Sequence, residues 1–337
     1  MSGLPTLADV YRARAAIGPW VRRTPLVRSE ALARRLGRSV HLKLETLQET
    51  GSFKLRGATN RMLALSEAER ARGVVAVSAG NHARAVAHAA ARLDVPAAVF
   101  MSTLVPENKV EAVRALGAEV RIVGEGQDAA EADARRLAKE QGRVFVSPFE
   151  DLQVIAGQGT IGLELLEDLP GLDTALVPLS GGGLIGGIAV ALKSADPAIR
   201  VIGISMERGA AMYQSLRAGR PVDVVEEPSL ADSLGGGIGL DNRYTFALVR
   251  DLVDEVLLVS EDEIAAAMAH CYWHEQQIVE GGGAVGIAAL LAGKVRALGD
   301  EIAVVLSGRN VDMRRFTEIL GLDPRTGARA PGSGQAA

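Results

Sequence analysis

The chain alternates short apolar runs with longer segments of helical periodicity, and this alternation limits the folds that it can adopt. β-Branched runs such as GVVAVS (73–78) and TALVPLS (174–180) are each followed by a segment rich in Ala and Leu. A strand with one wet face would alternate polar and apolar residues, whereas these runs are apolar throughout. We therefore predict an α/β fold in which parallel-rich sheets are covered by helices on both faces.

Composition excludes several classes of protein. The formal net charge is -4 and no basic patch is interleaved with aromatic residues, so nucleic acid is not an expected partner. Cys271 is the single cysteine, which rules out an intrachain disulfide and fits a reducing compartment. The start, MSGLPTLADV, does not resemble a signal peptide, and no run approaches the roughly 20 apolar residues of a membrane span. We expect a cytoplasmic protein of 337 residues, long enough for two domains.

The turns that follow the predicted strands are the places to look for a site. In parallel sheets ligands bind at the carboxyl ends of the strands, where the chain passes into a helix. The turns of this kind are SAGNH (78–82), SPFED (147–151), SGGGLIGG (180–187) and LSGRN (306–310).

The glycine-rich turn predicts an anion site. Successive glycines let backbone N–H groups converge on an anion at the start of a helix, and a phosphate is the expected guest. Gly181 to Gly186 also satisfy G-x-G-x-x-G, and Glu207 lies near the end of the next strand. That pattern is typical of dinucleotide binding, so a nicotinamide-dependent dehydrogenase stays open as an alternative.

Two other turns carry small polar side chains. In SAGNH, N–H groups and the Ser78 hydroxyl could bind a carboxylate while Asn81 donates to a ring oxygen; an ordinary helix N-cap by Ser78 or Asn81 is the alternative. In LSGRN, the Ser307 hydroxyl could face a heteroaromatic nitrogen or could cap the next helix.

Lys54 stands apart from the other lysines. The chain has six, and Lys54 lies between a glycine turn and a predicted helix, beside Phe53. The others fall on amphipathic segments, or alternate within HLKLE in the case of Lys43, and suit solvated roles. Burial would lower the pKa of the Lys54 amine and leave it neutral, able to form an imine.

The segment HCYWH (270–274) places two histidines one helical turn apart, as some metal sites do. It lacks the carboxylate of the metalloprotease pattern, so we interpret it as part of an amphipathic helix and expect no metal there. Cys271 in mid-helix is expected to pack rather than react.

Taken together these motifs resemble the fold-type II pyridoxal-phosphate enzymes, the family of threonine/serine dehydratases, serine racemase and tryptophan synthase β. The resemblance spans roughly residues 15–322. It depends on five motifs in the family's order and spacing: TGSFKLRGA, SAGNHARAVA, VPLSGGGLIGG, EGGGAVGIAAL and VVLSGRNVD.

The resemblance implies pyridoxal 5′-phosphate as cofactor and a role for each matching residue. Lys54 would carry the cofactor and move the Cα proton of the substrate. The phosphate would bind at Ser180, Gly181, Gly182, Gly183 and Leu184, the ring 3′-oxygen at Asn81 and the pyridine nitrogen at Ser307. Ser78, Gly80, Asn81 and His82 would hold the substrate carboxylate. A neutral hydroxyl at the pyridine nitrogen favours loss of a β-substituent over transamination.

The sequence departs from the family pattern in places that refine the prediction. Ala79 stands where serine racemase-like members carry a serine that reprotonates the opposite face, which argues for dehydration over racemisation. Ser205 falls where metal-binding members have a carboxylate, and Gly209 and Ala211 offer no replacement, so we expect no divalent-cation site. GGGA after Glu280 replaces a turn that usually contains proline.

These implications define the expected protein. It is a cytoplasmic lyase that eliminates water and ammonia from a 3-hydroxy amino acid, with L-threonine or L-serine as the default substrate, and it is a homodimer or homo-oligomer. Residues 50–145 form a small domain, and 1–49 plus 146–325 form a large cofactor-binding domain; 326–337 is a disordered tail. The alternatives within the family are a racemase and a dehydratase of hydroxyectoine degradation, because VIGISMERGAAM and ADSLGGGIGLDNRYTF are similar to that subgroup.

Overall fold

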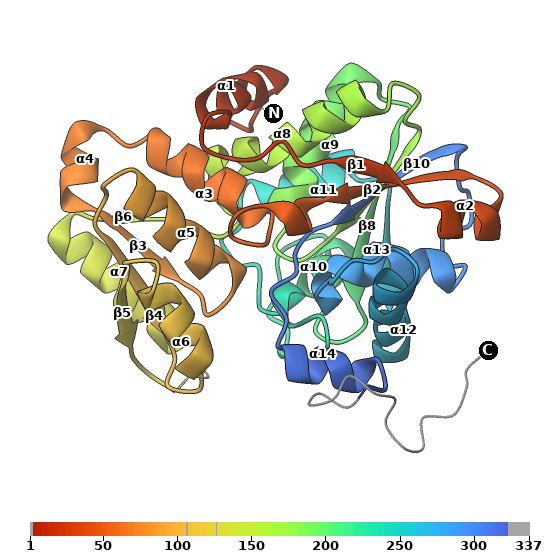
Figure 1. Cartoon of the computed structure of the whole chain (residues 1–337). Helices are drawn as coiled ribbons and strands as arrows, with labels where there is room; N and C mark the ends of the chain where they lie inside the picture. Colours follow the sequence, from red (N-terminus) through yellow and green to blue (C-terminus); the bar gives the residue numbers. More distant parts are fainter. Residues whose placement is uncertain (1–2, 106, 126, 323–337) are drawn as a thin grey trace.

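The computed structural model describes residues 3–105, 107–125 and 127–322. The predicted tail, 326–337, lies outside the described residues. Within these ranges the chain forms a six-stranded sheet in the order β1-β2-β10-β7-β8-β9 and a four-stranded sheet in the order β5-β4-β3-β6. The smaller sheet and its helices lie to one side of the larger sheet (Figure 1).

The larger sheet is built from both ends of the chain. Its strands are β1 (Leu26–Arg28), β2 (Ser39–Leu44), β7 (Thr174–Pro178), β8 (Arg200–Met206), β9 (Glu255–Val259) and β10 (Glu301–Leu306). The strands of the smaller sheet are consecutive: β3 (Val74–Val77), β4 (Ala97–Met101), β5 (Glu119–Ile122) and β6 (Val144–Phe145). Apart from the antiparallel pair β1 and β2, the paired strands are parallel.

Helices connect and cover the strands. The first group is α1 (Leu7–Ile17), α2 (Glu30–Leu36), α3 (Lys54–Leu63), α4 (Glu67–Arg72), α5 (Asn81–Arg92), α6 (Glu107–Arg114) and α7 (Gln127–Gln141). The second group is α8 (Leu152–Asp168), α9 (Gly183–Ala195), α10 (Ala211–Ala218), α11 (Thr245–Leu252), α12 (Glu261–Trp273), α13 (Gly281–Leu291) and α14 (Met313–Ile319). Two short 3-10 turns, η1 (Glu45–Leu47) and η2 (Asp232–Leu234), complete the described chain.

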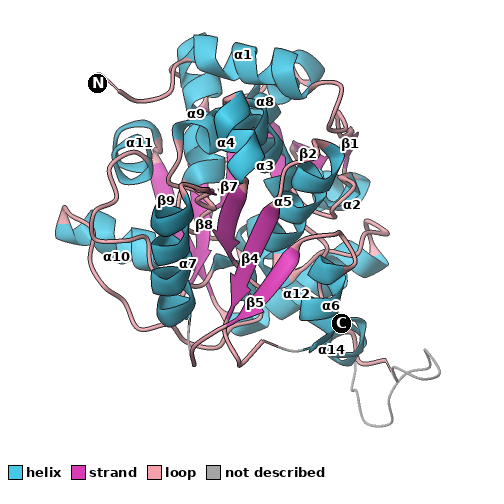
Figure 2. Ribbon diagram, turned by 90° about the vertical axis from the view of Figure 1, so that its left-hand side faces the viewer, coloured by secondary structure: helices cyan, strands magenta, loops and turns pink. Residues whose placement is uncertain are grey.

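Each sheet is buried on both faces, which explains its apolar strands. In β3, Val74 and Ala76 pack into the core that contains α5, whereas Val75 and Val77 pack into the core that contains α7. Helices α5 and α7 accordingly lie on opposite sides of this sheet (Figure 2). The larger sheet repeats the pattern, with one core against α13 and the other against α9. The predicted α/β fold with doubly covered, parallel-rich sheets is confirmed.

The N-terminal strands were not predicted. β2 lies between β1 and β10, so the first strands of the chain pair with the last. β3 to β6 fall within residues 50–145 and the other strands fall outside them; the domain boundaries stay a prediction. No helix in the described ranges combines the length and apolar character needed to cross a bilayer.

Candidate active site

Lys54 is the first residue of α3, and the preceding segment is tied to the end of β10. Phe53 N donates to the Ser307 carbonyl oxygen at 3.0 Å, and Ser52 pairs with Gly308 in an antiparallel bridge. These backbone contacts join residues that are more than 250 positions apart in the sequence, such as Phe53 and Ser307. They bring the predicted lysine beside the last of the predicted strand-end turns.

The side chain of Lys54 is half-buried. Its Nζ donates to the Pro148 carbonyl oxygen at 2.7 Å and lies 5.2 Å from the centre of the Phe53 ring. Burial lowers the pKa of Lys54 from 10.5 to about 8, and the negative charge of Glu280 opposes part of this shift. The direction of this shift matches the prediction, and it makes a neutral amine accessible near physiological pH.

The glycine-rich turn lies next to the same segment, because Phe149 follows Pro148. A Cβ on Gly181 would lie 2.3 Å from Cδ1 of Phe149, and one on Gly183 would lie 2.9 Å from its Cα. Gly182 has a left-handed φ of 87° and precedes α9, whose first turn has no side-chain cap. Glycine is therefore required for packing as well as for conformation. The uncapped helix start is suited to bind an anion.

The turn after β3 is not capped as an ordinary helix start. Gly80 is the N-cap of α5 without a side-chain cap, and its N–H donates to Ser78 Oγ at 3.1 Å. His82 Nε2 is 2.8 Å from the Val146 carbonyl oxygen, which requires Nε2 to carry the proton. Burial, followed by the positive charge of Lys54, lowers the pKa of His82 to about 3. His82 is thus a neutral donor beside the lysine.

Asn81 is buried and held from two sides. Its Nδ2 donates to Glu280 Oε1 at 2.6 Å, and its Oδ1 accepts from Asn310 Nδ2 at 2.6 Å. Ser307 is also buried, and it does not cap the next helix, because Asp312 caps α14. The four strand-end turns therefore lie around Lys54, as the sheet rule predicted.

Sequence reasoning missed two residues of this region, Glu280 and Asn310. Glu280 is the N-cap residue of α13 and is 4% exposed. Burial and then the charge of Asp232 raise its pKa to about 7. Both residues stand inside quoted motifs, EGGGA and LSGRN, but no local pattern indicates that they meet at Asn81.

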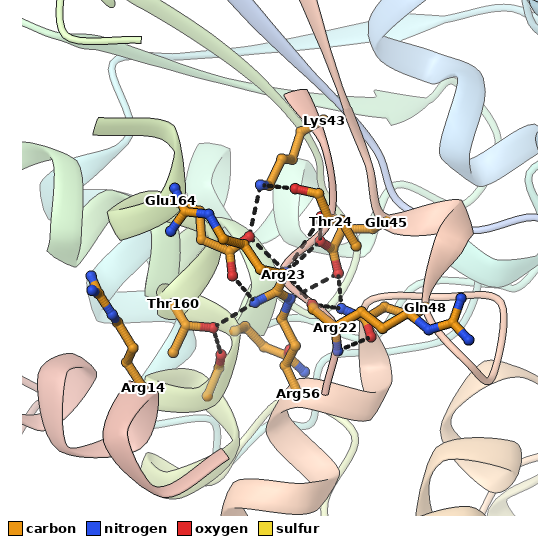
Figure 3. A network of polar contacts seen from close by, with 12 residues as sticks. Arg14, Arg22, Arg23, Thr24, Lys43, Glu45, Gln48, Arg56, Thr160 and Glu164 are labelled. Carbon is orange, nitrogen blue, oxygen red and sulfur yellow. Dashed lines mark hydrogen bonds and ion pairs between the residues drawn. The ribbon is translucent and has the colours of Figure 1, made fainter. Parts of the chain in front are cut away.

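A second set of buried charges lies behind Lys54 on α3. The guanidinium of Arg56 is between two carboxylates, with Nη2 2.7 Å from Glu45 Oε1 and Nη1 2.6 Å from Glu164 Oε1 (Figure 3). Burial alone would lower the pKa of Arg56, but Glu45 and then Glu164 outweigh it and raise the pKa. These bonds join α3 to η1 and α8 in the interior.

The same cluster corrects the prediction for Lys43. We expected a solvated side chain, but Lys43 is 0% exposed. Its Nζ lies 2.7 Å from Glu164 Oε2 and donates to the Thr24 carbonyl oxygen at 2.6 Å. The expectation was wrong because β2 is an inner strand of the sheet, covered on both faces, where a lysine needs a buried partner.

The other candidates do not join the site. His270 Nε2 is 3.0 Å from Glu275 Oε1, and Cys271 is fully buried, with the pKa of its thiol raised by burial. Among the described residues no group of three or more His, Cys, Asp or Glu side chains is arranged to hold a metal. Ser205 is buried at the end of β8. Glu207 is half exposed, 3.5 Å from Lys294 Nζ.

An amine of lowered pKa beside a glycine-lined helix start is the arrangement expected in an enzyme that uses a phosphorylated aldehyde. A model of the family described as pyridoxal-phosphate dependent enzymes matches residues 17–308. The chain belongs to this family. The dinucleotide interpretation of Gly181 to Gly186 is thereby replaced; a Cβ on Gly186 would meet Leu248 at 3.2 Å, so packing accounts for that glycine.

Proteins of similar sequence or structure are named for related activities. A Sinorhizobium fredii protein named for threonine dehydratase activity is 54% identical over 315 residues, 94% of this chain and 95% of that protein. The L-threonine ammonia-lyase of Thermotoga maritima is 45% identical over 94% of this chain and 78% of its own. The maize serine racemase structure matches with a TM-score of 0.88 and 36% identity, over 93% of this chain and 96% of that one.

The residues of this site fit pyridoxal phosphate. Lys54 offers the amine for the aldehyde, and the glycines beside Phe149 leave an uncapped helix start for the phosphate. Ser52 Oγ, two residues before Lys54 in the sequence, is buried and has no hydrogen-bond partner among the described residues, so this segment holds an unused hydroxyl. Asn81 and Ser307, both buried, would offer the ring a neutral amide and a neutral hydroxyl.

Proposed function

We propose that this protein is a dehydratase that converts a 3-hydroxy amino acid, L-threonine or L-serine, to a 2-oxo acid and ammonia. The observation that carries the proposal is Lys54, a half-buried amine with a lowered pKa where four strand-end turns meet. The relatives named as threonine dehydratases and ammonia-lyases support the substrate class.

The residues of the proposed site first divide the binding of the cofactor among them. Lys54 holds the cofactor aldehyde, and Ser180 to Leu184 bind its phosphate through backbone N–H groups. Asn81 donates to the ring 3′-oxygen and Ser307 faces the pyridine nitrogen. Pyridoxal phosphate, when bound, supplies an electron sink for the electron pair left at Cα.

The substrate carboxylate is assigned to the turn after β3. Ser78 provides its hydroxyl, and Gly80, Asn81 and His82 provide backbone N–H groups at the start of α5. Because Gly80 N now donates to Ser78 Oγ, binding requires that this bond be exchanged for one to the carboxylate. The His82 imidazole is neutral, since burial keeps its pKa near 3, and its one N–H stays on the Val146 carbonyl oxygen.

Proton transfer follows from the lowered pKa of Lys54. Once the substrate amine has replaced Lys54 on the cofactor aldehyde, Nζ is a free neutral amine. It takes the proton from Cα, and the electron pair of that bond forms the Cα–Cβ double bond. The β-hydroxyl leaves with the C–O electron pair, receives the proton that Nζ took from Cα, and departs as water. The released enamine is hydrolysed in solvent to the 2-oxo acid and ammonia.

The racemase alternative requires a second acid on the opposite face of the substrate. The structural similarity to maize serine racemase supports this alternative. Ala79 argues against it, because the alanine side chain has no proton to donate to Cα. Incubation with single enantiomers and chiral analysis separates the two. Hydroxyectoine degradation stays a prediction, because no feature of the site recognises a cyclic amidine.

The proposal is tested by the colour of the purified protein. We expect a yellow chromophore that borohydride fixes onto the peptide containing Lys54, and ammonia release from L-threonine or L-serine. Lys54→Ala should lose both colour and turnover. Label on the peptide of Lys43, which is buried but ion-paired, or unchanged turnover in Lys54→Ala, would refute the assignment.

The setting of the enzyme is part of the proposal. We infer a cytoplasmic homodimer or homo-oligomer, supported by the single cysteine and by the family likeness. Size-exclusion chromatography with light scattering measures the oligomeric state directly.

A further inference from the structure

The Asn81 amide is held in one orientation by a chain of hydrogen bonds. Asn310 Nδ2 donates to Thr50 O at 2.8 Å and to Asn81 Oδ1 at 2.6 Å. Because an amide nitrogen only donates, the oxygen of Asn81 must face Asn310 and its nitrogen must face Glu280. Asn81 Nδ2 has two N–H groups, and the structure gives one of them to Glu280 Oε1, at 2.6 Å. The second is the group available to a ligand.

The backbone of Glu280 is held by a hydrogen bond, and its side chain is buried. Its N–H donates to the Gly308 carbonyl oxygen at 3.0 Å, and it is 4% exposed. The charged groups that act on it come from three surrounding elements: Asp232 from η2, Lys109 from α6 and Lys54 from α3. Lys109 and Asp232 are themselves 3.5 Å apart.

The charge of Glu280 changes near neutral pH. Burial and Asp232 raise its pKa to about 7, while the Asn81 amide, the Asn310 backbone and Lys109 oppose the shift. A hydrogen bond to an ionised carboxylate is roughly twice as strong as one to a neutral acid. Asn81 is therefore held firmly when Glu280 is ionised and loosely when it is protonated.

We propose that Glu280 is a positioning residue that aims the free N–H of Asn81 at the ring 3′-oxygen of pyridoxal phosphate, and that its ionisation makes this aim depend on pH. The inference rests on the proposed function, and within it on the role of Asn81. In this proposal the Glu280 side chain does not touch the ring and acts on it through Asn81.

The test is a pH titration of the visible spectrum of the holoenzyme without substrate. The wild type should change its absorbance with a midpoint near pH 7, as the pKa of Glu280 requires. Glu280→Gln keeps the size and reach of the side chain but cannot ionise, so it should stay coloured and lose this transition. Glu275→Gln, whose partners are Ser29 and His270, is the matched control and should keep the wild-type midpoint.

Two exposed substitutions test the same idea without disturbing the buried side chain. Asp232 is 60% exposed and Lys109 is 40% exposed at their side chains, so both variants should fold. Asp232→Asn removes a negative charge that raises the pKa of Glu280 and should move the midpoint down. Lys109→Gln removes a positive charge that lowers it and should move the midpoint up.

The outcomes separate this inference from the proposed function. A holoenzyme without a chromophore on Lys54 would overturn the proposed function. A normal chromophore whose spectrum does not respond to pH near neutrality would overturn only the role of Glu280. That role is also refuted if the transition persists in Glu280→Gln, or if the two exposed variants move the midpoint in the same direction.

Discussion

Two buried lysines should respond in opposite ways to the same substitution. Lys54 and Lys43 are both removed from solvent, Lys54 partly and Lys43 completely. Lys54 has one backbone carbonyl as its partner, whereas Lys43 has a carboxylate at 2.7 Å. We predict that Lys54→Met stabilises the cofactor-free protein and that Lys43→Met destabilises it.

The magnitude for Lys54 follows from its pKa. A decrease from 10.5 to about 8 disfavours the ammonium form in the folded state, and at about 1.4 kcal/mol for each pKa unit this costs about 3 kcal/mol. Because the side chain is half-buried, solvent screening reduces the figure to about 2 kcal/mol. Loss of the bond to Pro148 offsets about 1 kcal/mol, which leaves a net gain of about 1 kcal/mol.

The sign of the pH dependence provides a check. The unfolded lysine binds a proton below pH 10.5, and the folded one only below about 8. The cost is therefore fully present below about pH 8 and disappears as the pH rises to 10.5. The advantage of Lys54→Met at pH 7 should shrink at pH 10.

For Lys43 the substitution leaves a buried carboxylate without one of its partners. Removing one member of a buried ion pair costs about 3–5 kcal/mol, and we expect the lower end because Arg56 still contacts Glu164. Urea unfolding of the cofactor-free variants at pH 7 measures both effects. If Lys54→Met lost as much stability as Lys43→Met, the amine would not be a desolvated group and the reasoning would be wrong.

Three further predictions concern the surroundings of the lysine. Gly181→Ala would place a methyl group 2.3 Å from Phe149, so the affinity for the cofactor, measured by equilibrium dialysis, should fall about tenfold or more. An unchanged affinity would show that the glycine turn does not bind the cofactor. Arg56→Met removes the shared partner of the buried Glu45 and Glu164 carboxylates and should lower the free energy of unfolding in urea by about 3–5 kcal/mol. A loss below about 1 kcal/mol would show that the remaining charges rearrange. His82 has a pKa near 3 in the folded protein, so its contribution to stability should decrease as the pH falls from 6.5 toward 3. In urea unfolding, the free energy of unfolding should therefore differ less between pH 7 and pH 4 in His82→Gln than in the wild type.

Local pattern determined much of this protein. The run Val74–Val77 is apolar at every position, and that pattern alone predicted a strand covered on both faces. The glycine turn and the helix start at Lys54 were likewise readable, because the requirements of a turn or a helix end are met by neighbouring residues. The motifs in their order were sufficient to indicate the family that the comparisons then showed.

Tertiary structure decided which charges are buried and which partners they have. β10 inserts between β2 and β7, and this sheet order covers Lys43 and joins it to Glu164. Asn81 and Glu280 are 199 residues apart, and they meet because the segment after β10 holds both. The periodicity of a sequence indicates only which residues share a face of one helix or strand. A hydrogen bond that depends on the order of strands in the sheet therefore cannot be predicted from a local pattern.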